Sequence, residues 1–85
     1  MFQVFLSNRA RKELRKLDKI DRLKIAKYID LLPNNPFLGQ KMEGELKDSY
    51  KIKIPPLRII YTPDFKNKII WIRALGFRGG IYKKL

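Results

Sequence analysis

Residues 50–62 read YKIKIPPLRIIYT, and the pattern of this stretch indicates the class of fold. Apolar side chains alternate with lysines from Tyr50 to Ile54, which is the period of a half-buried strand with an open, basic face. The proline pair at 55–56 ends that strand, because proline has no N–H to contribute to a ladder. Residues 58–62 predict a second strand. The stretch therefore predicts two strands joined by a short connection.

The downstream segment continues the strand pattern. Turn-forming residues occupy positions 63–67, and residues 68–75 predict a third strand. In that strand Ile70, Ile72 and Ala74 are expected to face the core, because side chains alternate between the two faces of a sheet. The short connections are typical of an antiparallel meander of three strands.

The upstream segment changes to the period of a helix. A short strand is expected over residues 2–6, and Ser7 then offers the hydroxyl of a helix N-cap. A tight break over residues 18–21 separates two helices, and the second stops before Pro33, because proline disfavours helix at the preceding residue. Their apolar stripes are Ala10, Leu14 and Leu17 in the first helix and Ile25, Tyr28, Ile29 and Leu32 in the second. The short break predicts an antiparallel helical hairpin.

These elements predict an α+β fold in the order β-α-α-β-β-β. We expect the N-terminal helical hairpin to pack on one face of a mostly antiparallel four-stranded sheet, with lysines and arginines on the opposite face. Residues 33–47 are expected to form a loop. A chain of 85 residues supports one hydrophobic core, so residues 1–85 are expected to form a single domain.

The charge of the chain is strongly positive. Lysine and arginine number 20 against eight acidic residues, which gives a net charge of +12. Such a charge opposes a compact state by self-repulsion and predicts a polyanionic partner. A charge-rich surface without a partner would carry both signs in similar number, and a membrane surface would require an amphipathic helix with a large free apolar face. With no long apolar run and no signal-peptide pattern, a soluble, cytoplasmic protein without a membrane partner is expected.

Two residue types that carry much enzyme chemistry are absent. The sequence has no cysteine and no histidine, which excludes disulfides, thiolate nucleophiles and the usual histidine base. Its carboxylates are scattered, apart from Glu43 and Glu45 in the expected loop. Neither a metal nor a small-molecule cofactor is therefore expected.

The basic residues fall into two groups. Those of residues 9–27 lie on the expected helices and are interpreted as a solvated face that adds general attraction to phosphates. Those of the sheet are more specific, because two lysines point from one face of a strand and an arginine begins the next. The final segment is expected to add an arginine and a tyrosine. The patch predicted in this way consists of Lys51, Lys53, Arg58, Arg78 and Tyr82. The aromatic residues interpreted either as core or as stacking planes beside it are Tyr61, Phe65, Trp71 and Phe77.

Such a patch can cleave RNA without histidine or metal, because RNA carries its own nucleophile in the 2′-OH. The protein has to align this hydroxyl with the adjacent phosphate, remove its proton and stabilise the charge that develops. Fixed cations supply the alignment and the charge stabilisation. A lysine crowded by other cations loses its proton more readily and is a candidate base, whereas arginine stays protonated and is suited to clamping the phosphate.

Three stretches resemble the RelE/ParE toxin superfamily. Residues 9–36, RARKELRKLDKIDRLKIAKYIDLLPNNP, are similar to its helical hairpin. Residues 46–64, LKDSYKIKIPPLRIIYTPD, are similar to its core strands, and residues 72–82, IRALGFRGGIY, to its closing segment. Together they cover nearly the whole chain in the same order. The resemblance implies a RelE-like fold and a toxin of a type II toxin–antitoxin system.

The resemblance also implies roles for the patch. All five positions of the RelE pattern are filled, which favours the branch that cleaves mRNA in the ribosomal A site. Lys51 and Lys53 match lysines that act as base or stabilise charge, and Arg58 matches a phosphate-clamping arginine. Arg78 matches an arginine that stabilises the transition state or the leaving group. Tyr82 matches a tyrosine that stacks on the substrate base and orients the 2′-OH.

The partners follow from the same resemblance. It implies a metal-independent, ribosome-dependent endoribonuclease that acts on mRNA in the ribosome and is inhibited by a RelB-like antitoxin, which is expected to be acidic. Two other functions stay open. One is a ParE-like inhibitor of DNA gyrase, and the other is a non-catalytic RNA- or ribosome-binding module.

Overall fold

The computed structural model describes residues 1–77 of the chain. The elements are, in order, β1 (Gln3–Leu6), α1 (Asn8–Lys16), α2 (Lys19–Leu31), β2 (Gln40–Lys41), β3 (Tyr50–Ile54), β4 (Leu57–Asp64) and β5 (Ile69–Phe77). Single turns of 3-10 helix over Leu32–Asn34 and Gly44–Leu46 lie between α2 and β3. No helix within the described residues combines the length and the apolar character needed to cross a bilayer.

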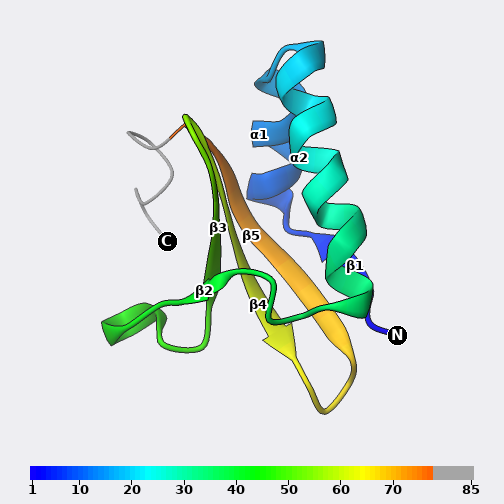
Figure 1. The fold of residues 1–85 in the computed structure, drawn as a ribbon, viewed down its shortest axis with the longest axis vertical. Helices are drawn as coiled ribbons and strands as arrows, with labels where there is room; N and C mark the ends of the chain where they lie inside the picture. Colours follow the sequence, from blue (N-terminus) through cyan, green and yellow to red (C-terminus); the bar gives the residue numbers. More distant parts are fainter. Residues whose placement is uncertain (78–85) are drawn as a thin grey trace.

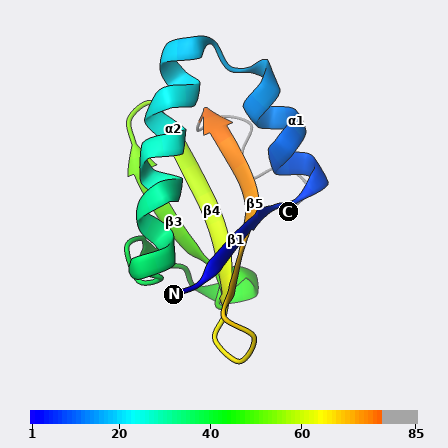
Figure 2. The same ribbon diagram turned by 90° about the vertical axis from the view of Figure 1, so that its right-hand side faces the viewer.

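The molecule has two layers, with both helices on the same face of the sheet (Figure 1). Figure 2 shows α1 and α2 side by side across this face. The strands follow the order β1-β5-β4-β3-β2; β1 runs parallel to β5, and the other neighbours are antiparallel. The predicted α+β class and helical hairpin are confirmed. The expected number of four strands is wrong, because Gln40 and Lys41, within the segment expected to be a loop, pair with Lys51 and Tyr50 as a short fifth strand.

Both helices begin at side-chain caps that the sequence places there. The Ser7 hydroxyl accepts a hydrogen bond from the Ala10 N–H at 3.0 Å, as predicted. A carboxylate oxygen of Asp18 accepts one from the Asp21 N–H at 2.8 Å, so α2 begins directly after the tight break. These bonds satisfy N–H groups that have no partner within the helix. The caps thereby determine where each helix starts and how the hairpin turns.

The hydrophobic core lies between the helices and the sheet. Its buried residues are Ala10, Leu17, Ile25, Leu32, Ile52, Ile54, Leu57, Ile59, Tyr61, Ile70, Ile72 and Leu75. Each isoleucine or leucine buried in this way contributes about 1.5–3 kcal/mol. The helix-facing side of the sheet takes the main core, and the other side carries charged residues together with a small apolar cluster.

A β-bulge in β5 changes the direction of its side chains partway along the strand. Ile60 of β4 pairs with Ala74, but Tyr61 pairs with Ile72, so Arg73 is the extra residue. An extra residue shifts the alternation by one position. The prediction that Ala74 faces the same core as Ile70 and Ile72 is therefore wrong: Ala74 packs on Ile60 in a separate small cluster. Leu75 takes its place in the main core.

Strand β4 is longer than predicted. The expected turn begins at Pro63, but Pro63 and Asp64 still pair with Ile70 and Ile69 of β5. Proline is tolerated here because β3 begins opposite Tyr61, so beyond that point β4 has a neighbouring strand on one side only. The turn between β4 and β5 therefore starts at Phe65.

Candidate functional site

The two lysines of β3 lie on the face of the sheet that is turned away from the helices. Ile52 and Ile54 of the same strand are buried in the main core. Lys53 is exposed and Lys51 is half-buried. Because neighbouring positions of a strand point to opposite faces, the predicted common direction of the two lysines is confirmed. We call this side of the sheet the outer face.

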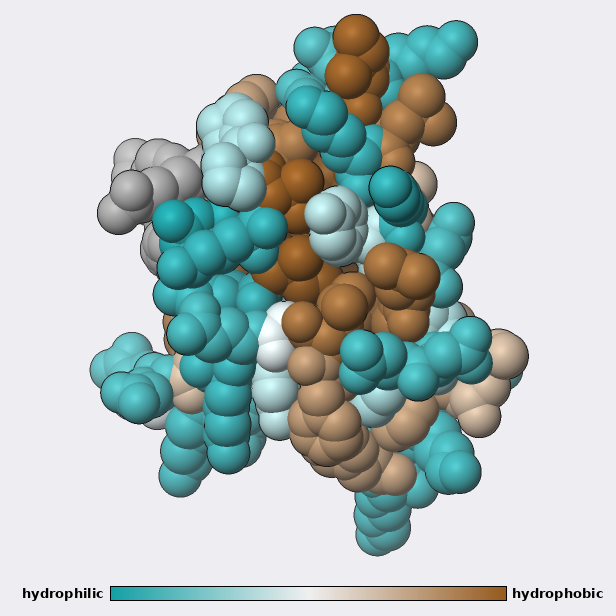
Figure 3. All heavy atoms as spheres, viewed as in Figure 1, coloured by the Kyte–Doolittle hydropathy of each residue, from teal (hydrophilic) through white to brown (hydrophobic). Residues whose placement is uncertain are grey.

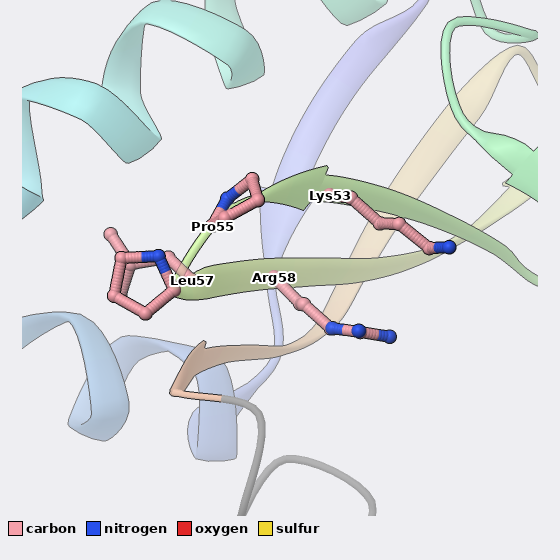
Figure 4. Close-up of a pocket in the computed structure, with 5 residues that line it drawn as sticks. Lys53, Pro55, Leu57 and Arg58 are labelled. Carbon is pink, nitrogen blue, oxygen red and sulfur yellow. The ribbon is translucent and has the colours of Figure 1, made fainter.

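Arg58 lies directly opposite Lys53 in the adjoining strand. The register pairs Lys53 with Arg58 and Ile54 with Leu57, which leaves Pro55 and Pro56 as the connection. Their side chains extend in the same direction from neighbouring strands (Figure 4). A pocket of about 350 Å³ lies beside them, and it is lined by Lys53, Pro55, Pro56, Leu57 and Arg58. The structure thus brings together two cations that the sequence places five positions apart.

Gly76 keeps the sheet open on the other side of Arg58. It pairs with Arg58 from β5, its φ is +134°, and nothing lies within 4 Å of the position that a Cβ would take. An L-amino acid with a side chain rarely adopts that φ. β5 therefore continues past Arg58 with a glycine at the position paired to it. The strand predicted over residues 68–75 ends before Gly76, whereas β5 continues through it to Phe77.

Three of the five predicted site residues can be placed. Lys51, Lys53 and Arg58 share the outer face of neighbouring strands. Arg78 and Tyr82 lie outside the described residues, so their expected positions stay predictions. Among the described residues no three acidic side chains gather as a metal site would require. The chemistry of the placed residues is that of fixed cations, which bind a phosphate and stabilise charge that develops on it.

Tyr61 belongs to the core, so the alternative interpretation as a stacking plane is wrong. Its ring is fully buried, and its hydroxyl donates to the Pro36 carbonyl and accepts from the Gly39 N–H, both at 2.8 Å. Burial raises the pKa of this hydroxyl, against the opposing effect of the Gly39 N–H. Phe65, Trp71 and Phe77 are all partly exposed.

A second polar pocket of about 290 Å³ lies on the outer face, toward the opposite end of β4. There the Ser49 and Thr62 hydroxyls are 2.8 Å apart, and Arg73 Nε donates to Thr62 Oγ1 at 3.1 Å. Glu45 and Asp48 add negative charge to its lining. Mixed charge suits this pocket less well to a phosphate than the pair of Lys53 and Arg58. The sequence interpretation did not identify it, because its residues come from three separate segments.

Comparison with known proteins shows one consistent likeness. The family model for the ParE toxin of the type II toxin–antitoxin system parDE matches residues 4–82. A curated protein of Methanocaldococcus jannaschii, assigned as toxin RelE1, is 31% identical over 86 residues and covers 96% of each chain. The isolated RelE toxin of E. coli superposes with a TM-score of 0.82 at 25% identity, over 91% of this chain and 84% of the other. The archaeal RelE–RelB complex of Pyrococcus horikoshii gives a TM-score of 0.72 at 28% identity, over 93% and 97%.

Proposed function

The chain belongs to the ParE toxin family of type II toxin–antitoxin systems, within the RelE/ParE superfamily, and from this premise we propose that it is a ribosome-dependent endoribonuclease of the RelE kind. The observation that carries the proposal is the pairing of Lys53 with Arg58 across β3 and β4, on the outer face and beside an open pocket. Such a pair concentrates positive charge where a phosphate can reach it, in a chain without histidine.

We assign the steps of cleavage to the five residues of the patch. The 2′-oxygen of the nucleotide attacks the adjacent phosphorus, and the bond from phosphorus to the 5′-oxygen breaks. This gives a 2′,3′-cyclic phosphate and, once the departing oxygen has taken a proton from water, a 5′-hydroxyl. Lys51 or Lys53 takes the proton of the 2′-OH while the other stabilises charge. Arg58 clamps a non-bridging phosphate oxygen.

The two remaining residues of the patch come from the closing segment of the sequence. We propose that Arg78 stabilises the charge on the departing oxygen. Tyr82 stacks on the base and orients the 2′-OH. Alignment and charge stabilisation together are expected to supply most of the rate enhancement, because neither a metal nor a histidine takes part in these steps.

The proposed partners are the ribosome with its mRNA, and an antitoxin. RelE of Pyrococcus horikoshii was solved in complex with RelB, which supports an antitoxin of that kind for this chain. A net charge of +12 favours an acidic antitoxin and promotes association with ribosomal RNA. The action is proposed to take place in the cytoplasm, where translation occurs.

Primer extension on mRNA in ribosomes incubated with the protein tests the proposal. Wild type is expected to produce new mRNA ends within the A-site codon. Arg58→Ala is expected to lower the cleavage rate by about 100-fold or more, because a preorganised charge on the phosphate is lost. Arg58→Lys keeps the charge but loses the bidentate geometry of the guanidinium. Its cleavage rate is expected to lie between those of wild type and Arg58→Ala.

The matched control is Arg22→Ala on α2, which removes one exposed arginine from the other side of the molecule and is expected to cleave as wild type does. Circular dichroism and urea unfolding establish that each variant is folded. A folded Arg58→Ala variant that cleaves A-site mRNA at the wild-type rate would remove the basis of the proposal. Binding to ribosomes without new ends would instead indicate a non-catalytic module.

A ParE-like action on DNA gyrase is the second candidate, and the match to the ParE family model favours it. It predicts inhibition of gyrase supercoiling by the purified protein in the absence of ribosomes. Arg58→Ala and Arg22→Ala would then inhibit gyrase alike, because no phosphate has to be clamped for cleavage. A supercoiling assay with these same variants separates the two functions.

A further inference from the structure

Aromatic rings form a continuous run at the end of the sheet away from the Pro55–Pro56 connection. Phe65 stacks on Phe37 with centroids 5.2 Å apart, and Phe37 meets Tyr50 edge-on at 5.9 Å. Phe2 meets Phe65 edge-on at 5.8 Å. Although they contact one another, Phe37 is 61% exposed and Phe65 47% exposed. We call Phe37, Phe65 and Tyr50 the aromatic platform.

The platform is held rigidly although it is exposed. Phe37 stands between Pro36 and Gly39, and both of these backbones bond to the buried Tyr61 hydroxyl. A Cβ on Gly39 would lie 2.6 Å from the Lys51 carbonyl oxygen. The loop can therefore lie this close to β3 only because residue 39 has no side chain. The loop therefore presents the Phe37 ring in a fixed position.

The turn that carries Phe65 is equally well defined. The Asp64 carboxylate accepts hydrogen bonds from the side chain of Asn67 at 2.8 Å and from its N–H at 3.1 Å. Lys68 closes the turn with a φ of 55°, which few residues other than glycine adopt. Two separately stabilised loops thus bring two phenylalanines into contact in water. Rigid, exposed apolar surface of this kind marks an interaction site, because it is not needed for the core.

Positive charge adjoins the rings. A hollow of about 190 Å³ is lined by Lys41, Lys47, Asp48, Tyr50, Pro63 and Phe65. Lys41 pairs directly with Tyr50 across β2 and β3. Figure 3 views this side, and it shows apolar surface over the loop after α2 and the adjoining end of the sheet, with hydrophilic side chains on both flanks. Planar rings beside ammonium groups are the arrangement on which single-stranded nucleic acids stack their bases and place their phosphates.

We propose that the aromatic platform, with Lys41 and Lys47, is a second binding site for single-stranded RNA, separate from the paired Lys53 and Arg58. Six residue steps along β4 place Asp64, which precedes the Phe65 turn, about 20 Å from Arg58, whereas three steps along β3 place Tyr50 about 10 Å from Lys53. The site binds RNA without cleaving it. It therefore extends the proposed function and does not depend on catalysis. An acidic peptide would satisfy the lysines but would leave the faces of the rings without a planar partner.

Fluorescence anisotropy with a labelled, mixed-sequence, single-stranded RNA tests the site on the full-length protein. The double variant Phe37→Leu/Phe65→Leu keeps the apolar volume but removes the ring faces, and it is expected to bind at least about tenfold more weakly. For Lys41→Gln/Lys47→Gln, the slope of log binding constant against log salt concentration is expected to become shallower by about 0.7 for each lysine removed. The matched controls are Phe5→Leu, an exposed ring outside the platform that is expected to leave binding unchanged, and Lys24→Gln on α2, which is expected to lose only general attraction and therefore to weaken binding less than the platform variants do.

Photo-crosslinking with the same RNA carrying 5-bromouridine locates the contact. Crosslinked peptides that contain residue 37 or 65 support the proposal, and their appearance in an Arg58→Ala variant separates this site from the cleavage patch. Wild-type affinity of a folded double phenylalanine variant, with crosslinks confined to other segments, overturns it. That result would leave the platform as a surface for a protein partner.

Discussion

The Ser7 hydroxyl donates a hydrogen bond to the Arg73 carbonyl oxygen at 2.9 Å, across 66 positions of sequence. The same hydroxyl accepts from the Ala10 N–H, and the Ser7 N–H donates to the Ile72 carbonyl. Ser7 therefore ends β1, caps α1 and holds the bulge of β5. One small side chain joins the helix layer to the strand that changes its alternation.

Ser7→Ala is expected to destabilise the protein by about 1–3 kcal/mol, because it removes a helix cap and a hydrogen bond to the bulge. Urea unfolding measures the change. Ser7→Thr keeps the hydroxyl and is the matched control, expected to retain most of the stability. A Ser7→Ala variant as stable as wild type would mean that neither bond contributes.

Tyr61→Phe is expected to cost about 1–3 kcal/mol at neutral pH, because it leaves the Pro36 carbonyl and the Gly39 N–H without their partner. The cost should shrink in alkaline solution. Burial raises the pKa of Tyr61 above its ordinary value of 10.0, so above pH 10.0 the unfolded chain loses this proton before the folded one does. The wild type then loses stability until the folded-state pKa is passed, whereas the phenylalanine variant lacks this ionisation. The urea midpoints of both proteins, measured from about pH 8 to about pH 11 in steps of roughly one pH unit, give the stability difference at each pH. A stability difference that stays constant over this range would contradict the prediction.

Asn67→Ala is expected to return the pKa of Asp64 toward its ordinary value of 3.8. The Asn67 side chain is the main cause that lowers this pKa, followed by the Asn67 N–H. NMR titration of the Asp64 carboxyl measures the change, with Asn34→Ala as the control that leaves it alone. Because the folded-state pKa is lowered, the contribution of Asp64 to stability is present above pH 3.8 and is lost as the pH falls through the lowered value. An unchanged titration in Asn67→Ala would assign the shift to other groups.

Gly76→Ala is expected to destabilise the protein by about 1–3 kcal/mol through backbone strain alone, since its φ of +134° is unfavourable for alanine and the space around it is open. Gly44 offers a comparison, because it is equally open but has a φ of +70°. Asparagine tolerates the left-handed region near +70°. Gly44→Asn should therefore be mild while Gly76→Asn is as costly as Gly76→Ala. Equal costs for the two asparagine variants in thermal unfolding would show that the φ difference is unimportant.

Lys53→Gln is expected to stabilise the protein by about 0.2–1 kcal/mol at low salt, because like charges directly opposite in a sheet repel. The gain should decrease as salt screens the repulsion. Cleavage of A-site mRNA should fall in the same variant. Lys24→Gln, which lowers the net charge equally on α2, controls for general self-repulsion. If both glutamine variants changed stability alike, the Lys53–Arg58 pair would carry no specific repulsion.

Local patterns account for the parts of the fold that were predictable. The alternation from Tyr50 to Ile54 coincides with β3, the cap predicted at Ser7 begins α1, and the break predicted over residues 18–21 coincides with the start of α2. These features depend on a few neighbouring residues. The short strand β2 was not predictable, because two residues carry no period and pair only where β3 presents a free edge.

The bulge is the clearest case of a feature that a local pattern conceals. Within the sequence, Arg73 looks like an ordinary outward residue between Ile72 and Ala74. Only the pairing with β4 makes Arg73 the extra residue, and the distant Ser7 hydroxyl donates a hydrogen bond to the Arg73 carbonyl oxygen. The prediction that side chains of this strand alternate between the two faces was therefore correct as far as Ile72 and wrong beyond it.

The candidate site divides in the same way. The sequence by itself determined that Lys51 and Lys53 share one face of a strand, that the chain lacks histidine, and that its charge suits RNA. The tertiary structure decided that Arg58 stands opposite Lys53 with Gly76 beyond it, and that Phe37 meets Phe65. The period of a strand is set within a few residues by backbone geometry. A contact between separate segments depends instead on register and packing, to which the whole chain contributes.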